Sequence, residues 1–257
     1  MGIQLGMAES IFGPSAGVLA CSLRGLASHA HAPSDSARGL IEWVSAEGCR
    51  GVVLDAIHPE MRPRDLGRSA RRDLAASVRR AELEWMGIDV FVPAAHLASA
   101  EHSDRALAAV IGAIELAGEL RTMGIGDKPV VTLDLPDEPA EGVVRTIADA
   151  AERAGVIVAC LSEKHQLLKR AIDLDAMHEA GADVVGALTT ARTAQVRWGG
   201  PRIERRVDLF SVRGSLAIRT SPCAAVLDIS RSFEPARTIG TAIQAWSKAD
   251  PASGLAH

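Results

Sequence analysis

Eight side chains that can bind a metal, a ligand or a proton follow short apolar segments of this sequence. They are carboxylates, histidines and one arginine: Asp55, His58, His96, Asp134, Glu163, Asp173, Arg197 and Asp228. Carboxylate oxygens and imidazole nitrogens can together hold a divalent cation such as Mn²⁺, Mg²⁺ or Zn²⁺. A carboxylate whose pKa lies near the working pH can also accept or donate a proton. These residues predict metal or acid–base chemistry wherever the fold brings them together.

A second group of side chains suits a small anionic or sugar-like substrate. Arginines follow the apolar segment 51–55, and a further arginine follows the segment that begins at 194. A guanidinium can form two parallel hydrogen bonds with a carboxylate or a phosphate. The residues predicted to bind substrate are therefore Arg62, Arg64, Arg197, His58 and Trp198. The alternative for the first two is that they form surface ion pairs with neighbouring carboxylates such as Glu60 and Asp65.

The elements that must position these residues alternate between short apolar runs and longer amphipathic stretches. Bounded apolar runs are typical of buried parallel strands, and the longer stretches are typical of helices. Strands are predicted at 17–23, 51–55, 84–92, 129–135, 156–161, 171–173, 194–198 and 224–229. Helices are predicted at 36–47, 69–81, 103–123, 139–154, 175–191, 207–217 and 235–248, with a short fifth helix that ends at 166–170.

Eight strand–helix pairs without a long linker favour one closed (β/α)8 barrel, the TIM barrel, over two domains. The chain of 257 residues has the usual length of such a barrel. We predict a single domain over 1–257 with a flexible tail from about 249. In such a barrel the chemistry lies at the carboxyl ends of the strands, where the eight side chains above are found.

The segment 39–63 reads GLIEWVSAEGCRGVVLDAIHPEMRP and continues as RDLGRSARRDL over 64–74. It resembles the first helix and second strand of the sugar phosphate isomerase/epimerase superfamily, the xylose isomerase-like TIM barrels. A weaker similarity extends over 194–197 and 226–228. The resemblance implies the barrel fold and an isomerase or epimerase that acts on a small sugar or polyol derivative.

The same resemblance implies a division of labour among the site residues. A divalent metal would polarise a carbonyl or hydroxyl of the substrate while two carboxylates move a proton between adjacent carbons. By this analogy Glu163 and Asp228 are the acid–base pair. The implied metal ligands are Asp173, Asp134 and His96.

The sequence departs from the pattern of the superfamily at three positions. The glutamate of its fifth strand falls on Leu161, with Glu163 two residues later, and a histidine ligand of its seventh strand is replaced by Arg197. The eighth strand usually ends near a glutamate, whereas this chain has the shorter Asp228. Arginine is always cationic and repels a metal. The alternative function is therefore a catalytically degenerate barrel that binds an anionic metabolite without metal.

Charge and hydropathy exclude several other classes of protein. The formal net charge of −4 and the pI of about 6.1 argue against nucleic-acid binding, which usually requires a basic domain. The apolar runs are too short to span a membrane, and the first residues do not resemble a signal peptide. We therefore expect a cytoplasmic protein with a small-molecule partner, and a homodimer stays an open alternative.

Overall fold

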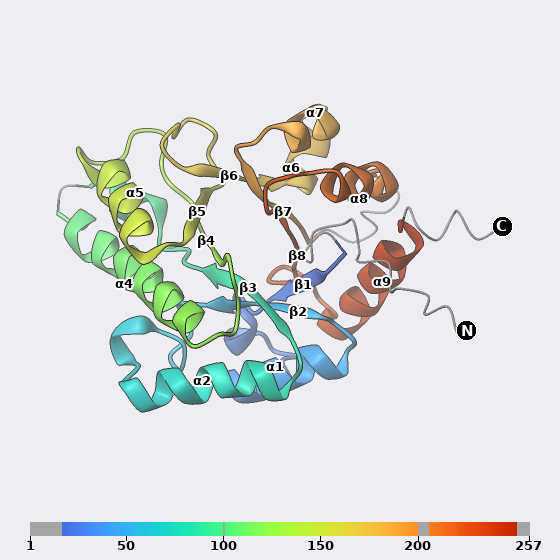
Figure 1. The fold of residues 1–257 in the computed structure, drawn as a ribbon, viewed down its shortest axis with the longest axis horizontal. Coiled ribbons are helices and arrows are strands. Elements are labelled where there is room, and N and C mark those ends of the chain that lie inside the picture. The colour runs from blue at the N-terminus through green and yellow to red at the C-terminus, as the bar shows by residue number, and fades with distance from the viewer. Residues whose placement is uncertain (1–16, 100, 200–205, 251–257) are drawn as a thin grey trace, which may run out of the picture.

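The computed structural model describes residues 17–99, 101–199 and 206–250, and within them eight parallel strands close into a barrel in sequential order (Figure 1). The predicted single (β/α)8 barrel is confirmed as the fold. The residues 1–16 and 251–257, including most of the tail expected to be flexible, lie outside the described residues. The strands are β1 (Leu19–Ser22), β2 (Gly51–Asp55), β3 (Glu84–Asp89), β4 (Val130–Leu133), β5 (Ile157–Cys160), β6 (Lys169–Asp173), β7 (Thr193–Trp198) and β8 (Ala224–Asp228).

Helices surround the barrel and cover its outer face (Figure 1). Several begin at a residue whose side chain caps the first turn; for example, the Ser36 hydroxyl accepts a hydrogen bond from Gly39 N at 3.1 Å. The described helices are α1 (Ala37–Ala46), α2 (Arg68–Arg80), α3 (Ala94–Ala98), α4 (Ser103–Thr122), α5 (Val143–Ala154), α6 (Leu174–Glu179), α7 (Val184–Thr189), α8 (Leu209–Ala217) and α9 (Pro235–Lys248).

Two helix predictions near β6 were wrong. The short helix expected to end at 166–170 does not form: the residues 161–168 are all described, they form turns, and β6 begins at Lys169. The long helix expected at 175–191 is split into α6 and α7. Gly181 has φ of 65°, a left-handed conformation that ends α6, and Asp183 then caps α7 by accepting from Gly186 N at 2.9 Å.

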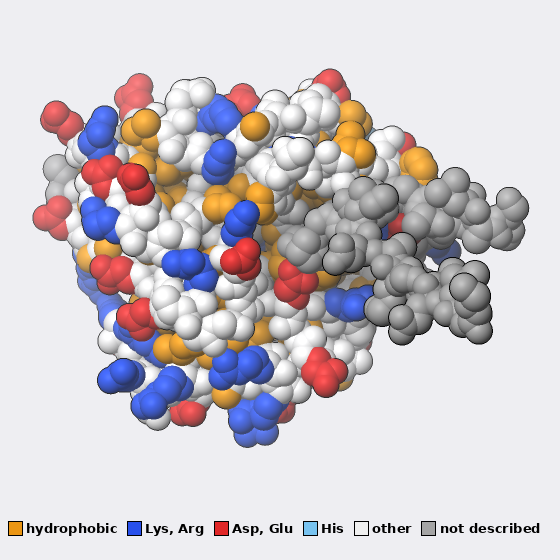
Figure 2. Space-filling model, viewed as in Figure 1, with side chains coloured by type: hydrophobic (Ala, Val, Ile, Leu, Met, Phe, Trp, Pro, Cys, Tyr) orange, Lys and Arg blue, Asp and Glu red, His pale blue; other side chains and the backbone are white. Residues whose placement is uncertain are grey.

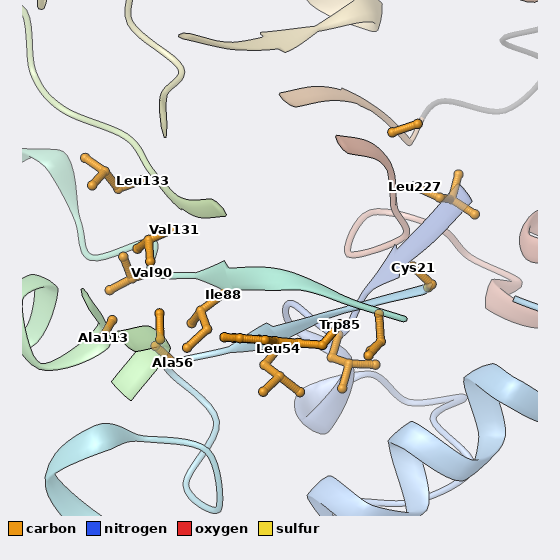
Figure 3. Close-up of a cluster of buried hydrophobic side chains, with 14 of the residues drawn as sticks. Cys21, Leu54, Ala56, Trp85, Ile88, Val90, Ala113, Val131, Leu133 and Leu227 are labelled. Atoms are coloured by element: carbon orange, nitrogen blue, oxygen red, sulfur yellow. The ribbon is translucent and has the colours of Figure 1, made fainter. Parts of the chain in front are cut away.

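The main apolar core lies between the strands and the helices. Trp85, Ile88 and Leu54 pack there from β2 and β3 (Figure 3). Each large apolar side chain that is fully buried contributes about 1.5–3 kcal/mol to folding. The inside of the barrel is filled largely by small side chains, among them Ala20, Val53, Met86, Ala224 and Val226, and, in a second cluster, Val130, Ala159, Ala171 and Ala194.

A bulge in β3 reverses the direction in which the side chains at the end of this strand point. The register with β2 shifts where Met86 is inserted between Trp85 and Gly87. Gly87 has φ of 151°, and a Cβ there would lie 1.9 Å from the carbonyl oxygen of Val130, so only glycine fits. Trp85 faces the helices, and strict alternation would also point Asp89 outward. The extra residue turns Asp89 into the barrel instead.

A second bulge acts in the same way on β7. The register with β6 shifts so that Ala194 is inserted between Thr193 and Gln195. Ala194 packs inside the barrel, and the side chain of Gln195 also lies inside, where it hydrogen-bonds Thr132 of β4. The alternation after the bulge therefore points Arg197 inward.

The surface carries both signs of charge. On the face seen in Figure 2, Lys and Arg side chains are interspersed with Asp and Glu, and blue side chains gather along the lower edge, where Figure 1 places the arginine-rich α2. None of the helices in the described residues is long and apolar enough to cross a membrane.

Candidate functional site

Arg197 lies at the centre of the carboxyl end of the barrel. Its Nη1 and Nη2 donate to Asp89 Oδ1 and Oδ2 at 2.6 and 2.8 Å, and Nη2 also donates to Asp228 Oδ2 at 2.9 Å. Only 4% of the Arg197 side chain is exposed, and Asp89 is fully buried. Such bidentate ion pairs are strong and directional, because both partners are charged and planar.

Neutral polar side chains complete this buried network. Ser22 of β1 donates to Asp89 Oδ2 at 2.5 Å, and Gln195 Oε1 accepts from Arg197 Nη1 at 3.0 Å and from Thr132 at 2.9 Å. Among the described residues, Gln195 Nε2 has no hydrogen-bond partner. A buried donor left unpaired costs about 1–3 kcal/mol of stability. Such a donor calls for an explanation, for example a functional role or a bound water.

Arg24, which follows β1, forms the exposed rim above this network. Its Nη1 donates to Asp228 Oδ2 at 3.2 Å, and its guanidinium lies 3.8 Å from the centre of the Phe91 ring. One third of the Arg24 side chain is exposed, so this cation faces solvent at the mouth of the barrel. Asp55 holds the loop in place by accepting from Gly25 N at 3.1 Å. At the mouth, the guanidinium of Arg24 is therefore fixed against the ring of Phe91 by a cation–π contact.

The carboxyl groups around the mouth differ in their pKa. Burial by itself would raise the pKa of Asp228, but the charges of Arg197 and Arg24 and the hydrogen bonds from Arg197 and Ser230 together outweigh burial and hold that pKa below its usual value. Burial works to lower the pKa of Arg197, but the charges and hydrogen bonds of Asp89 and Asp228 together outweigh it, so the pKa of the guanidinium is raised. Burial raises the pKa of Asp55 and also that of the half-buried Asp134. The mouth therefore combines one carboxylate whose ionised form is stabilised, Asp228, with carboxyls that hold their protons more tightly.

Of the predicted residues, the structure brings Asp228, Arg197 and Asp134 to this mouth. Asp134 follows β4 and lies close enough to Arg24 for the positive charge to act on its pKa. Asp173 neighbours Arg197 in the sheet ladder. Its Oδ1, however, accepts from the backbone N of Asp175 at 3.0 Å and caps α6, so this carboxylate has a structural task.

Glu163 is not brought together with Asp228. Its side chain is 69% exposed and pairs with Arg170 Nη2 at 2.8 Å. Both residues line a hollow of about 780 Å³ between β5, β6, α6 and α7, and Asp228 is not part of its lining. Because β5 already ends at Cys160, the strand does not continue far enough to aim Glu163 into the barrel. The expected pair of Glu163 and Asp228 is corrected on this ground.

The loop after β2 uses its polar residues to hold itself together. His58 is buried, its Nε2 donates to Asp35 O at 2.9 Å, and its Nδ1 accepts from Glu60 N at 3.1 Å. Both ring nitrogens are thereby occupied. Arg62 and Arg64 pair with Asp65 at 3.2 and 3.6 Å, as the alternative interpretation expected.

Two further predicted residues lie away from the mouth. His96 is exposed on α3, where its ring meets that of His102 edge to face at 5.2 Å. Trp198 is 1% exposed and packs against Trp246 of α9, with ring centres 5.4 Å apart. Successive residues of a strand face opposite sides, so Trp198 points outward because Arg197 points inward. The expectation that Trp198 lines the mouth is corrected.

The residues at the mouth do not fit a divalent metal. In the described part of the chain, no group of three or more His, Cys, Asp or Glu side chains is arranged to hold an ion. Asp228 and Asp89, the ionisable oxygens nearest the centre, are already bound to the guanidinium of Arg197. A divalent ion would have to compete for these oxygens with the guanidinium of Arg197 and, at Asp228, also with that of Arg24.

Sequence reasoning missed several residues of the mouth. Arg24 lies two residues beyond β1, and Phe91 and Asp89 lie in a segment predicted to be one continuous strand. Gln195 offered a signal, because a buried amide inside an apolar strand is uncommon. A polar residue within a predicted barrel strand therefore deserved the same weight as those at the strand ends.

Comparisons with known proteins define the class by its fold. No family model matches the chain, and none of the curated proteins does. Solved structures show that the chain shares its (β/α)8 barrel fold with sugar epimerases and a xylose isomerase domain protein. A D-psicose 3-epimerase from Clostridium cellulolyticum H10, solved with D-tagatose, superposes with a TM-score of 0.65 at 13% identity, over 90% of this chain and 99% of that chain.

Two more solved structures give the same result. A 3-keto-D-glucoside 4-epimerase from E. coli has a TM-score of 0.61 at 11% identity, over 90% of this chain and 98% of that one. A xylose isomerase domain protein from Alicyclobacillus acidocaldarius has a TM-score of 0.60 at 13% identity, with the same coverage of 90% and 98%. At these identities the likeness is one of fold.

Proposed function

We propose that this isomerase/epimerase-like barrel binds a small sugar or polyol derivative carrying an anionic group, at the carboxyl end of the barrel and without a divalent metal. The observation that carries the proposal is Arg24, a partly exposed arginine held against Phe91 beside Asp228. The position agrees with the general rule that barrels of this kind bind their ligands at the carboxyl ends of the strands. Sugar epimerases among the solved structures of the same fold favour a sugar-like ligand.

The chemistry of the mouth matches such a ligand. Arg24 uses Nη1 for Asp228, and a guanidinium has further donors that can pair with a carboxylate or phosphate. Carboxylates such as Asp228 accept hydrogen bonds from hydroxyl groups, and Phe91 holds the guanidinium of Arg24 in place for an anionic group.

Binding to metal-free protein tests this proposal. The chain is treated with EDTA, and sugar phosphates, sugar acids, neutral sugars and polyols are compared by calorimetry and by the shift of the melting temperature. We expect an anionic member to bind and to raise the melting temperature. Arg24→Ala should weaken its binding by about 10- to 100-fold, the loss of one charged hydrogen-bonding partner.

Arg38→Ala is the matched control, because this arginine is an exposed partner of Glu42 on α1. It should bind like the unchanged chain. Full affinity in Arg24→Ala, or binding by none of the anionic compounds, would contradict the proposal.

A second candidate function is proton transfer on the bound ligand by Asp134. It is favoured by the raised pKa of this carboxyl and by its place near Arg24, which could stabilise developing negative charge on the substrate. Incorporation of deuterium from heavy water into a bound sugar, followed by NMR in EDTA, measures it. Asp134→Asn should abolish exchange, whereas Glu163→Gln, which changes an exposed partner of Arg170 away from the mouth, should leave it intact.

A further inference from the structure

The centre of the mouth contains two carboxylates that need a cation between them. Asp89 enters from β3 and Asp228 from β8, and both bind the guanidinium of Arg197 at distances of 2.6 to 2.9 Å. Asp89 and Arg197 are almost completely buried. Two carboxylates in such a place repel each other and lose hydration, so an unpaired pair would take up protons or bind a positive ion.

We infer that Arg197 is a built-in cation that takes the place of a divalent ion between Asp89 and Asp228. It acts as a positioning residue, because its hydrogen bonds to both carboxylates balance their charge and fix their orientation for a ligand at the rim. This inference rests on the proposed function only for the assignment of the mouth as a ligand site. Its test uses no sugar, so the two can fail separately.

The geometry supports a permanent rather than an exchangeable cation. The guanidinium meets Asp89 with two parallel hydrogen bonds and also reaches Gln195 Oε1 at 3.0 Å, so its plane is fixed on several sides. The bulges of β3 and β7 are what turn Asp89 and Arg197 toward each other. A metal ion that bound the same oxygens would have to displace the covalently attached guanidinium and then lie beside it.

Removing the built-in cation should therefore create a cation site. In Arg197→Ala the carboxylate of Asp89 loses its guanidinium partner and that of Asp228 keeps only Arg24, so the melting temperature should fall by about 10 °C. Low-millimolar guanidinium or Mn²⁺ should then restore part of this loss, because each binds only the folded variant. The unchanged chain, after EDTA treatment, should show no rise with Mn²⁺, Mg²⁺ or Zn²⁺.

Sodium chloride at equal ionic strength controls for screening. Arg213→Ala is the matched variant, because Arg213 lies on α8 and pairs with Asp250 at 2.7 Å, just after the end of α9, rather than with a residue of the mouth. It should lose stability without any rescue by guanidinium or Mn²⁺. Direct titration calorimetry of Mn²⁺ into each protein gives a second readout.

Two results would overturn the inference. One is a rise in the melting temperature of the unchanged chain with a divalent ion that disappears in Asp228→Asn. The other is a folded Arg197→Ala that responds to neither guanidinium nor Mn²⁺. Should that variant fail to fold, Arg197→Lys, which keeps the charge, decides: metal insensitivity supports the inference, and stabilisation by Mn²⁺ refutes it. Rescue without any sugar binding would leave the inference standing and refute only the proposed function.

Discussion

The two sides of the carboxyl end of the barrel hold their charged side chains in opposite ways. On the side of β3, β7 and β8, Arg197, Asp89 and Asp228 form a buried network. On the side of β5 and β6, the ion pair of Glu163 and Arg170 is exposed at the edge of a hollow of about 780 Å³.

The backbone explains this difference. β7 runs in continuous register with β8 from Gln195 to Trp198, whereas β5 and β6 are joined only at Ala159–Lys169 and Cys160–Arg170. The described residues 161–168 between β5 and β6 form turns rather than a helix. Where the strands pair continuously and exclude water, electrostatic interactions are strengthened. Where the pairing is short and the side chains are exposed, water and salt screen them. The same charges therefore contribute rigidity on one side and little on the other.

The largest effect should follow from removing Asp89. Asp89→Ala leaves the buried Arg197 without its two-pronged partner and should lower the free energy of unfolding by about 3–5 kcal/mol. Chemical denaturation monitored by fluorescence measures the loss. The control is Asp65→Ala, a half-exposed partner of Arg62, for which we expect a change within about 0.5 kcal/mol. Similar losses in both variants would erase the proposed difference between buried and surface pairs.

The second-largest effect should follow from disturbing the bulge of β3, which turns Asp89 into the barrel. Gly87→Ala adds a Cβ that meets the carbonyl oxygen of Val130 and should cost about 2–4 kcal/mol through clash and backbone strain. Gly124→Ala is the control, because Gly124 has φ of 77° and open space around it, so it isolates backbone strain at about 1 kcal/mol. Equal costs at the two glycines would show that the bulge is not held by the close contact.

Asp228 should sharpen the comparison through its pH dependence. Its pKa in the folded state lies below the unfolded value of about 3.9, so its contribution is present above that pH and is lost as the pH falls through the folded pKa. Asp228→Asn should lower stability by about 1–3 kcal/mol at neutral pH and by less in acid. Denaturation curves from neutral pH to pH about 3 check the sign. A loss that stays constant over this range would argue against an ionised Asp228.

The smallest effect should come from Glu163. Glu163→Gln removes the charge of an exposed ion pair and should change stability by about 0–1 kcal/mol, with the difference vanishing at high salt. Thermal denaturation at low and high ionic strength measures it. A loss as large as that of Asp89→Ala would mean that the β5–β6 side is no more open than the other.

Much of the fold was predictable because its signals are local. The apolar run of β2 ended where predicted, at Asp55, and the last helix was predicted at 235–248, the bounds of α9. Apolar periodicity, Gly and Pro are properties of neighbouring residues, and they determine where elements begin and end. The error at 175–191 arose because the left-handed turn at Gly181 interrupts an otherwise helical composition.

The site was predictable only in part. Asp228 and Arg197 were found because they end strands, and the structure joins them at 2.9 Å. Glu163 was misplaced because the end of β5 cannot be located from its apolar run alone. Asp89 was overlooked because it lay inside a predicted strand that in the structure contains a bulge.

By itself the sequence determined the alternation of strands and helices, and with it a barrel whose polar strand ends share one opening. The tertiary structure alone decided which side chains enter that opening. One inserted residue in β3 and one in β7 reverse the facing of Asp89 and Arg197. Facing depends on register between strands, and register is a property of paired segments that are distant in the chain.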